Sequence, residues 1–260
     1  MTNFDISSRS KITVILLSLF ILIAFYNKFF YHTGSNIIQY QISNNQKYSQ
    51  NKIEIKNRVG FFLIGTGKYI RLTSQLMNSM EMYFCTKKRT YDVYVHYFIL
   101  TDNLTFKPNI SVQNSNRNFS IFYQKKLAWP ESTLLRFENI LQNEEKINFK
   151  SFDYLYWLDS DAKMVDYVCE DIFGDLVGTM HPHYYKSSDP YPYESNNPKS
   201  TAFLEQHHKY ENPYYVGAFY GGSGIEMYKL FKTCHENIQY DFNKLNGFIA
   251  FVHDESHLNR

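Results

Sequence analysis

The sequence predicts an α/β domain in which a mostly parallel, twisted sheet has helices on both faces, preceded by one N-terminal membrane-spanning helix. Three observations lead to this prediction. Apolar runs of strand length alternate with segments of helical spacing across residues 58–260. One of these runs, at 152–158, is rich in aromatic residues and ends abruptly in the acidic triplet Asp-Ser-Asp. A long uncharged apolar run lies close to the N-terminus.

Composition favours a folded domain and makes a nucleic-acid partner unexpected. Hydrophobic residues make up 44% of the 260 residues and aromatic residues 18%, enough to bury a substantial core. The net charge is +2, and the basic residues are scattered, whereas a nucleic-acid-binding surface needs them clustered. The three cysteines show no CxxC spacing and allow one disulfide at most, so we expect each to be a buried, small hydrophobic residue.

The N-terminal apolar run predicts a signal-anchor. Residues 12–26 (ITVILLSLFILIAFY) carry no charge, and Arg9 and Lys11 precede them. Positive charge before an apolar span keeps the N-terminus in the cytosol. We therefore expect a cytosolic tail at 1–11, a transmembrane segment at 12–31 and a lumenal remainder. A cleaved signal peptide is the alternative, although large aromatic residues stand where small ones would precede a cleavage site.

The segment after the span is polar and contains no clear periodicity. Residues 32–57 are rich in Asn, Gln, Ser and Lys, which is typical of a stem between a membrane and a folded domain. Three N-glycosylation sequons follow within one polar stretch of the domain, beginning at Asn103, Asn109 and Asn118. Their grouping indicates a lumenal surface that can bear glycans.

The domain is expected to begin with a strand and a helix. Residues 59–64 (VGFFLI) form a continuous apolar run that leads into a Gly-Thr-Gly turn. Residues 70–84 then place apolar side chains at helical spacing. The remaining elements that we expect are strands at 91–100, 119–123 and 152–158 and a helix at 132–142.

The Asp-Ser-Asp triplet follows a strand of the buried, parallel type. Ligands bind beyond the carboxyl ends of such strands. Asp159 and Asp161 flank Ser160, so the alternation of side chains along an extended chain points both carboxylates to one side. Paired oxygen ligands suit a hard cation such as Mn²⁺ or Mg²⁺, which in turn binds phosphates. The alternative is that the aspartates cap a following helix.

Downstream motifs strengthen the first interpretation. HPHYY begins at His181, YYVGAFYGG occupies 214–222 and HDESHLN occupies 253–259. With the Asp-Ser-Asp triplet, this ordered set resembles the family 6 glycosyltransferases, which include the histo-blood-group transferases and the α-1,3-galactosyltransferases. The resemblance covers about 59–260. It implies a GT-A fold that uses a UDP-sugar with Mn²⁺ or another divalent cation, and transfers galactose or N-acetylgalactosamine in α-1,3 linkage, with retention, to a galactoside acceptor on a glycoprotein or glycolipid.

The resemblance also implies roles for individual residues. Glu255 matches the catalytic carboxylate beneath the anomeric carbon, which also contacts the acceptor, and His181 matches an acceptor contact. Asp159 and Asp161 match the metal ligands. Ala218 favours galactose, because a methyl group closes the space for an acetamido group. The implied donor-binding residues are Phe62, Ile64, Tyr69, Arg136, Asp159, Ser160, Asp161, Val216, Gly217, Ala218 and Asp254.

Other interpretations stay open beside this one. By residue type alone Phe62 and Ile64 could be core residues, and Asp254 and Glu255 could cap a helix that begins at Ser256. The resemblance implies a type II Golgi membrane protein whose domain would continue past Arg260, so we expect the sequence to be a fragment. A membrane-anchored, non-catalytic binder of glycan or nucleotide is the main alternative function, and a metal-dependent hydrolase is another.

Overall fold

The structure, a computed structural model, describes residues 57–86, 93–110, 116–205 and 213–260. The predicted tail, transmembrane segment and all but the last residue of the predicted stem lie outside these ranges. No helix in the described part of the chain is long and apolar enough to cross a membrane. The described strands are β1 (Asn57–Ile64), β2 (Val93–Thr101), β3 (Arg117–Tyr123), β4 (Tyr154–Leu158), β5 (Leu176–Met180) and β6 (Tyr215–Ser223).

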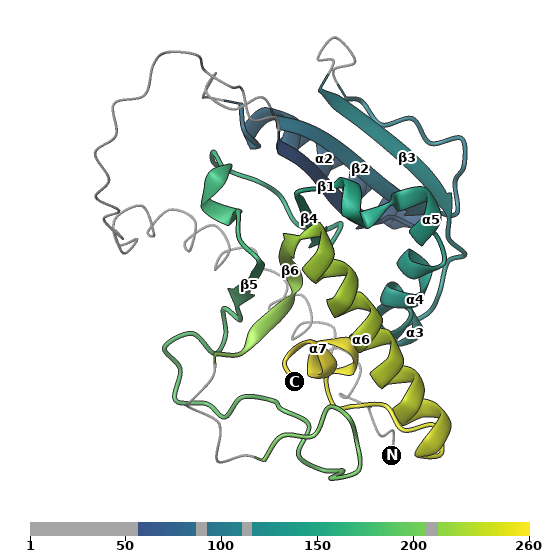
Figure 1. Ribbon diagram of the computed structural model, residues 1–260, viewed down its shortest axis with the longest axis vertical. Helices are drawn as coiled ribbons and strands as arrows, with labels where there is room; N and C mark the ends of the chain where they lie inside the picture. Colours follow the sequence, from purple (N-terminus) through teal and green to yellow (C-terminus); the bar gives the residue numbers. More distant parts are fainter. Residues whose placement is uncertain (1–56, 87–92, 111–115, 206–212) are drawn as a thin grey trace, which may run out of the picture. The chain divides into compact units, whose positions relative to one another are not determined.

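These strands form one mixed sheet in the order β3-β2-β1-β4-β6-β5 (Figure 1). The four strands from β3 to β4 are parallel to one another, as predicted. Strand β6 runs antiparallel to both of its neighbours, β4 and β5, so the sheet is parallel in one part and antiparallel in the other. This strand was not expected from periodicity, because its segment, YVGAFYGGS, contains three glycines between its aromatic residues.

Helices cover both faces of the sheet, as the buried apolar runs predict. Alternating side chains of β1 serve two separate cores. Val59, Phe61 and Leu63 pack toward α2, whereas Phe62 packs toward α4 and α6. The described helices are α2 (Ile70–Tyr83), α3 (Glu131–Leu134), α4 (Arg136–Leu141), α5 (Glu144–Ile147), α6 (Gly224–Lys244) and α7 (His253–Leu258), with 3-10 turns η1 (Gly67–Tyr69), η2 (Phe149–Ser151) and η3 (Glu170–Ile172).

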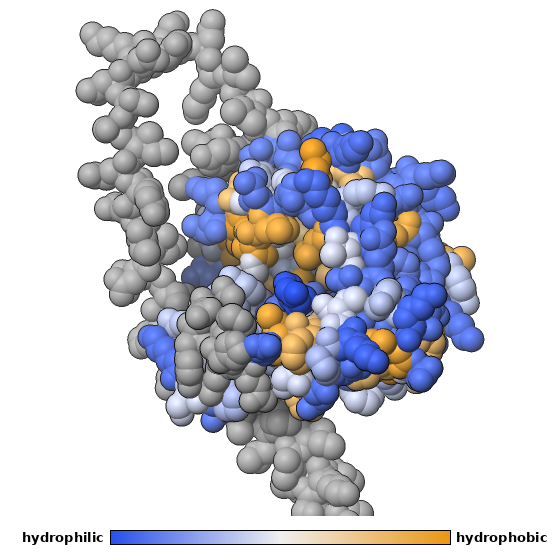
Figure 2. Space-filling view, turned by 60° about the horizontal axis from the view of Figure 1, so that its bottom comes forward, coloured by the Kyte–Doolittle hydropathy of each residue, from blue (hydrophilic) through white to orange (hydrophobic). Residues whose placement is uncertain are grey.

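The burial of these apolar residues leaves a largely polar exterior. Figure 2 shows one face of the molecule, where hydrophilic side chains cover most of the surface and hydrophobic side chains gather in patches between them. The largest fully buried side chains come mainly from the central strands β1, β2 and β4 and from helices α2, α4 and α6. The core therefore lies on both sides of the sheet.

The helix expected over 132–142 is wrong as a single element. The chain leaves helical geometry at Leu135, with φ −92° and ψ 5°, and forms α3 before it and α4 after it. Leu134 and Arg136 are both buried. In a continuous helix these two side chains would point about 200° apart, so the break allows both to face the protein interior.

Two of the three cysteines are not the free, buried residues that were expected. Cys85 and Cys169 form a disulfide across 84 positions of sequence, at the end of α2 and immediately before η3. Backbone pairing brings them together, since Cys85 N–H donates to Val168 O over 2.9 Å. Cys234 alone matches the expectation of a free, buried residue, with 1% exposure.

Candidate active site

The Asp-Ser-Asp triplet follows the buried strand β4 and enters a turn. Asp159 N–H donates to Ala218 O over 2.9 Å, which continues the pairing of β4 with β6 by one residue. Ala162 N–H donates back to Asp159 O over 3.0 Å and closes the turn. The next helical element after the triplet is η3, which begins at Glu170, so the helix-capping alternative for the two aspartates is wrong.

Ser160 fixes this turn to the rest of the protein. Its side chain is buried, and its Oγ donates to Ile64 O over 2.5 Å and accepts from Thr73 Oγ1 over 3.0 Å. The triplet is therefore fastened to the end of β1 and to α2. The side chain of Ser160 faces the interior, while the expected donor contact of this residue remains a prediction. Asp159 is partly exposed and Asp161 is exposed.

Arg136 is the buried centre of the site. Its Nη1 donates to Gly217 O over 3.0 Å and lies 3.6 Å from Asp159 Oδ1, while its Nε lies 3.1 Å from Asp254 Oδ2. The guanidinium also stacks over the Trp157 ring, 4.4 Å from its centroid. One cation thus joins the Asp-Ser-Asp triplet, strand β6 and helix α7. Burial lowers the pKa of Arg136, but the two carboxylates raise it by more, so the net pKa is raised and the guanidinium stays charged.

The carboxylates around Arg136 are difficult to ionise together. Burial raises the pKa of Asp159 to about 6, and the nearby charge of Asp161 adds to that shift, although Arg136 opposes it. Burial likewise raises the pKa of Asp254 against the opposing effect of Arg136. Several acidic groups held this close are characteristic of a functional site, where a further cation would balance them.

Glu255 is held against strand β6 by a backbone hydrogen bond. Gly217 N–H donates to Glu255 Oε2 over 2.6 Å. Burial raises the pKa of Glu255, while this hydrogen bond and the hydroxyl of Tyr214 lower it. Helix α7 begins at His253 and has no side-chain cap, so Asp254 and Glu255 do not cap a helix that starts at Ser256. That alternative is wrong, since both carboxylates point to groups outside their own helix.

The segment 216–218 of β6 lies between these groups. Gly217 bonds Glu255 on one side and Arg136 on the other, and Ala218 accepts from the Asp159 amide. A Cβ at position 217 would stand 3.2 Å from Glu255 Oε2, so a glycine here permits the close approach of α7. Val216 is partly buried. The structure thus brings together the predicted sugar-selecting segment, the acidic triplet and the predicted catalytic carboxylate.

The predicted nucleotide-binding residues at the end of β1 are in different environments. Phe62 is 0% exposed and packs against Phe98, Phe149 and Phe231, so its ring has no surface for a base. The ring of Phe62 therefore belongs to the core, while the expected donor contact of this residue remains a prediction. Ile64 is partly buried and receives the Ser160 hydroxyl, and Tyr69 is 45% exposed in η1.

His181 lies directly after β5 in a group of aromatic rings. Its N–H donates to Tyr214 O over 2.8 Å, and its ring centroid lies 4.7 Å from that of Tyr184. Burial, and next to it the neighbouring His183, lowers the pKa of His181 to about 4, so the ring is neutral near pH 7. Tyr214 connects this group to the site, because its hydroxyl faces Glu255.

The acidic triplet fits a divalent cation that takes its other ligands from elsewhere. Within the described ranges, no group of three or more His, Cys, Asp or Glu side chains could hold a metal ion by itself. The Asp159 and Asp161 carboxylates are close enough for one to raise the pKa of the other. A hard cation bound mainly by substrate phosphates and water requires only one or two protein carboxylates.

Sequence reasoning missed several residues that build the site. Trp157 donates from Nε1 to Asp159 Oδ1 over 3.0 Å, and Thr73 holds Ser160. Asn259 bonds the backbone of Tyr215 in both directions. The repeated tyrosines could have drawn attention to Tyr215, and the HDESHLN motif to Asn259. Trp157, in contrast, looked like an ordinary residue of a buried strand.

Comparisons with known proteins agree with this geometry. The sequence model of glycosyltransferase family 6 matches residues 38–260 of this chain. Human globoside alpha-1,3-N-acetylgalactosaminyltransferase 1 is 34% identical over 203 residues, covering 78% of this chain and 56% of the relative. The rat histo-blood group ABO system transferase 2 is 30% identical over 203 residues, covering 78% of this chain and 58% of the relative. The Escherichia coli O-antigen biosynthesis glycosyltransferase WbnI is 30% identical over 206 residues, covering 77% of this chain and 80% of the relative.

The chain spans 56% and 58% of the length of the two animal relatives described above. The matched region contains the acidic triplet, the segment 214–222 and the HDESHLN motif, which are the parts that the fold assembles around Arg136. The chain belongs to glycosyltransferase family 6.

Proposed function

We propose that this protein is a retaining, UDP-sugar-dependent hexosyltransferase that transfers galactose or N-acetylgalactosamine in α-1,3 linkage to a galactoside-type acceptor on a glycoprotein or glycolipid. The names of two relatives support the proposal. The human globoside enzyme is an alpha-1,3-N-acetylgalactosaminyltransferase, and the rat relative is an ABO system transferase. The mixed sheet with helices on both faces fits a GT-A nucleotide-sugar transferase fold.

One observation supports this function above the others: Arg136 joins the acidic triplet to the helix that carries Glu255. It lies 3.6 Å from Asp159 and 3.1 Å from Asp254, which is adjacent to Glu255 in the chain. The groups assigned to the diphosphate and to the reacting sugar are therefore held at one place by a buried, permanently charged residue. A donor bound there would have its phosphates near the triplet and its sugar near α7.

The residues assigned to the diphosphate and the nucleoside of the UDP-sugar follow from the groups present beside the acidic triplet. Asp159 and Asp161 would hold Mn²⁺ or another divalent cation. The nucleoside would bind near Ile64, at the end of β1, and Tyr69, in the following turn η1. When bound, such a cation supplies positive charge that stabilises the departing diphosphate. Arg136 keeps Asp159 in place and offsets its charge.

At the sugar end, Glu255 is assigned as the carboxylate that acts at the anomeric carbon. In a retaining transfer the bond from this carbon to the diphosphate breaks and a bond to the acceptor oxygen forms on the same face. Glu255 serves either as the nucleophile of a two-step route or as the anion that stabilises an oxocarbenium-like centre. The Gly217 hydrogen bond occupies Oε2 and fixes the direction of the carboxylate. Asp254 is assigned to the donor sugar and His181 to the acceptor.

The sugar preference is assigned to β6. Ala218 follows Gly217 on this strand, beside Glu255 and the Asp159 amide. A methyl group at 218 reduces the space for an acetamido substituent, so galactose is the proposed donor sugar. The discrimination should be modest, since one methyl group in a pocket changes selectivity by about 10- to 200-fold.

The cellular setting proposed is the Golgi lumen, with the chain anchored by its apolar N-terminal segment in type II orientation. The Cys85–Cys169 disulfide supports an oxidising compartment, because such bonds persist in the secretory pathway and are rare in the cytosol.

A transfer assay tests the proposed function. Purified protein is incubated with labelled UDP-galactose or UDP-N-acetylgalactosamine and a β-galactoside, with Mn²⁺ or with EDTA. We expect metal-dependent transfer, faster with UDP-galactose. Release of free sugar in excess of transfer would indicate a hydrolase, and binding of UDP without either reaction would indicate a non-catalytic homologue.

A further inference from the structure

Helix α7 carries Asp254 and Glu255 but is only six residues long. Isolated helices shorter than about 12 residues are barely stable in water. The helix also begins without a side-chain cap. Its position must therefore be fixed by contacts with other parts of the chain, and these contacts decide where the Glu255 carboxylate points.

The C-terminal end of α7 is fastened to β6 by the carboxamide of Asn259. Its Oδ1 accepts from Tyr215 N–H over 2.7 Å, and its Nδ2 donates to Tyr215 O over 2.8 Å and to Glu255 O over 2.9 Å. The carboxamide thus pairs with the strand in both directions, as a neighbouring strand would. Two residues farther along β6, Gly217 N–H bonds Glu255 Oε2.

The spacing of these contacts aligns the helix with the strand. Tyr215 and Gly217 are two residues apart and present their backbone groups to the same side of β6. Glu255 and Asn259 are four residues apart and lie on one face of the helix and its last turn. The side chains of Glu255 and Asn259 therefore bond to two backbone positions of β6 and together orient α7 along the strand.

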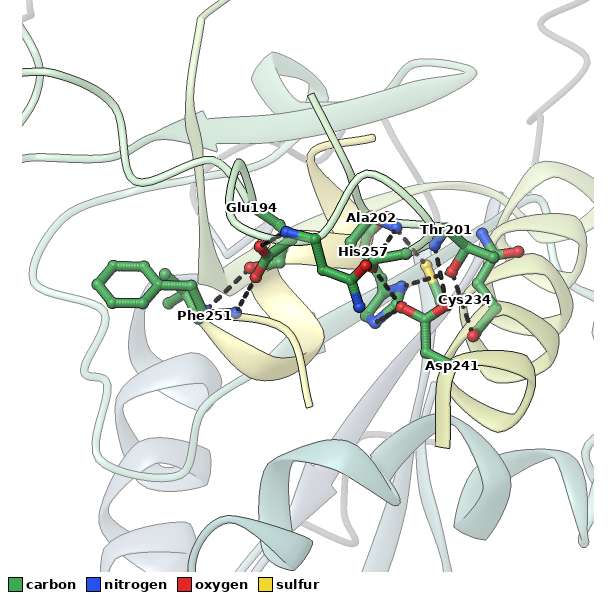
Figure 3. A network of polar contacts seen from close by, with 12 residues as sticks. Glu194, Thr201, Ala202, Cys234, Asp241, Phe251 and His257 are labelled. Atoms are coloured by element: carbon green, nitrogen blue, oxygen red, sulfur yellow. Dashed lines mark hydrogen bonds and ion pairs between the residues drawn. The ribbon is translucent and has the colours of Figure 1, made fainter. Parts of the chain in front are cut away.

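The segment that enters α7 is held by another side chain, that of the buried residue Glu194 (Figure 3). Glu194 is 1% exposed, and its Oε2 accepts from Phe251 N–H over 2.8 Å. Its Oε1 accepts from the N–H groups of Asn196 and Asn197, over 2.7 Å and 3.1 Å. Both oxygens are therefore used by backbone donors: two N–H groups of the 194–197 turn bond Oε1, and one N–H group, two positions before α7, bonds Oε2.

A third set of contacts, made by His257, holds α7 against helix α6 (Figure 3). His257 Nε2 lies 3.9 Å from Asp241 Oδ2 on α6, and His257 Nδ1 lies 3.4 Å from Thr201 Oγ1. This set has the composition of a catalytic triad, but the side chains of Asp241 and His257 are each 1% exposed. It packs α7 onto α6 and offers no surface to a substrate.

We propose that Asn259 and Glu194 are positioning residues for sugar transfer. Asn259 sets the Glu255 carboxylate against β6, and Glu194 sets the path by which the chain enters α7. The proposal rests on the proposed role of Glu255. Neither residue is assigned a contact with the donor or the acceptor, so their loss should lower the rate of the chemical step while the binding of UDP-galactose is kept.

The test uses Asn259→Ala and Glu194→Gln in the full chain. Asn259→Ala removes the three hydrogen bonds of the carboxamide. Glu194→Gln replaces one acceptor oxygen by a donor that faces backbone N–H groups. The matched control is Asn243→Ala, which removes an exposed carboxamide on α6 that bonds Gln239 over 3.3 Å. Should Asn259→Ala fail to fold, Asn259→Gln keeps the carboxamide on a longer stem and tests the same point.

Two measurements are made on each variant. The first is kcat and KM with UDP-galactose, Mn²⁺ and a β-galactoside. We expect kcat to fall roughly 10- to 100-fold in both variants, with KM for the donor changed less than about threefold, because misplacement of a reacting group by about 1 Å has effects of this size. The second is amide hydrogen exchange, in which Asn259→Ala should speed exchange at Gly217 and in 253–258 while exchange in β1 is unchanged.

Each outcome decides the inference. Unchanged exchange at Gly217 in Asn259→Ala would show that the residue does not hold α7, whatever the activity. Faster exchange with an unchanged kcat would show that the held position is irrelevant to transfer. A parallel rise in KM and fall in kcat, shared by Asn243→Ala, would indicate general destabilisation and also overturn it. If the wild-type protein transfers no sugar, the proposed function fails and the transfer role falls with it, but the exchange data still show separately whether Asn259 holds α7.

Discussion

Gly217 N–H donates a 2.6 Å hydrogen bond to Glu255 Oε2, which joins strand β6 to helix α7 at the centre of the site. Gly217 O accepts from Arg136 at the same residue. One glycine thus holds an anionic side chain through its donor and a cationic side chain through its acceptor. This arrangement places Glu255 close to the groups that surround the acidic triplet.

Glu255→Gln should abolish most of the transfer activity without unfolding the protein. The substitution keeps the size of the side chain but removes the negative charge assigned to the anomeric centre. We expect kcat to fall about 10²-fold or more, as when an essential charged group in an active site is removed. The measurement is steady-state transfer from UDP-galactose beside a urea titration.

The control for this variant is Glu236→Gln, which neutralises a side chain with 62% exposure on α6. Its activity should match that of the wild type. An unchanged rate in Glu255→Gln would remove Glu255 from the mechanism and leave the Gly217 contact with a structural role only.

Arg136→Met should destabilise the protein severely. The substitution leaves Asp159 and Asp254 without the cation that lies 3.6 Å and 3.1 Å from them. Removing one partner of a buried ion pair costs about 3–5 kcal/mol of unfolding free energy. Urea unfolding measures this change, and the exposed Arg71→Met on α2 should stay within about 0.5 kcal/mol of the wild type. Equal effects of the two substitutions would contradict the assigned position of Arg136.

The Cys85–Cys169 disulfide should contribute measurably to stability. It closes a loop across 84 positions, and bonds of this kind stabilise small proteins by about 2–4 kcal/mol, mainly by restricting the unfolded chain. We expect the double variant Cys85→Ser/Cys169→Ser to lose that amount of unfolding free energy. Dithiothreitol should lower the stability of the wild type and leave that of the double variant unchanged. A wild type insensitive to the reductant would show that the bond is not formed.

His96 should make the protein less stable as the pH falls. Burial, and next to it the charge of Arg58, lowers the pKa of His96 from 6.5 to about 4. The unfolded chain takes up the proton near pH 6.5, whereas the folded protein resists it down to about pH 4. The contribution of His96 is thus fully present above pH 6.5 and is lost progressively between these two values.

The variant His96→Gln isolates this contribution, because glutamine keeps hydrogen-bonding groups that can face Ser120 and Tyr94. The free energy of unfolding, measured between about pH 7 and pH 4.5, should decline less steeply in the variant than in the wild type. Asp159, whose pKa is raised, acts in the opposite direction in both proteins and cancels in the difference. Parallel profiles would show that His96 titrates normally in the folded protein.

Much of the fold follows from short-range pattern. The apolar runs at 59–64, 91–100, 119–123 and 152–158 correspond to β1 to β4, because buried parallel strands need apolar side chains on both faces. The helix expected at 70–84 corresponds to α2 for the same kind of reason. These elements could be predicted since each is determined mainly by its own residues.

Other features depend on partners far along the chain and could not be predicted in this way. The antiparallel placement of β6 depends on its register with β4, from Tyr154 opposite Ser223 to Leu158 opposite Phe219. The disulfide depends on contact between α2 and the residues before η3. Phe62 looked suited to a nucleotide from its motif, but its side chain points to the face of β1 that α6 covers.

The site shows the same division. The acidic triplet and Glu255 could be found from their residue types and motifs, since carboxylates after a buried strand need a reason to be there. The contacts that hold these groups in place could not be predicted. Thr73 holds Ser160 across 87 positions, and Asn259 holds Tyr215 across 44. Such contacts have no local signature in the sequence.

The most direct test of the central claim is titration calorimetry of UDP binding to the wild type and to Asp161→Asn, with Mn²⁺ and with EDTA. Asp161 is exposed, so the variant should fold normally. We expect Mn²⁺ to strengthen UDP binding to the wild type by about tenfold or more and to have little effect on the variant, because both carboxylates are assigned to the cation that connects the protein to the diphosphate. UDP binding of equal strength in EDTA and in Mn²⁺, or full Mn²⁺ dependence in Asp161→Asn, would contradict the account.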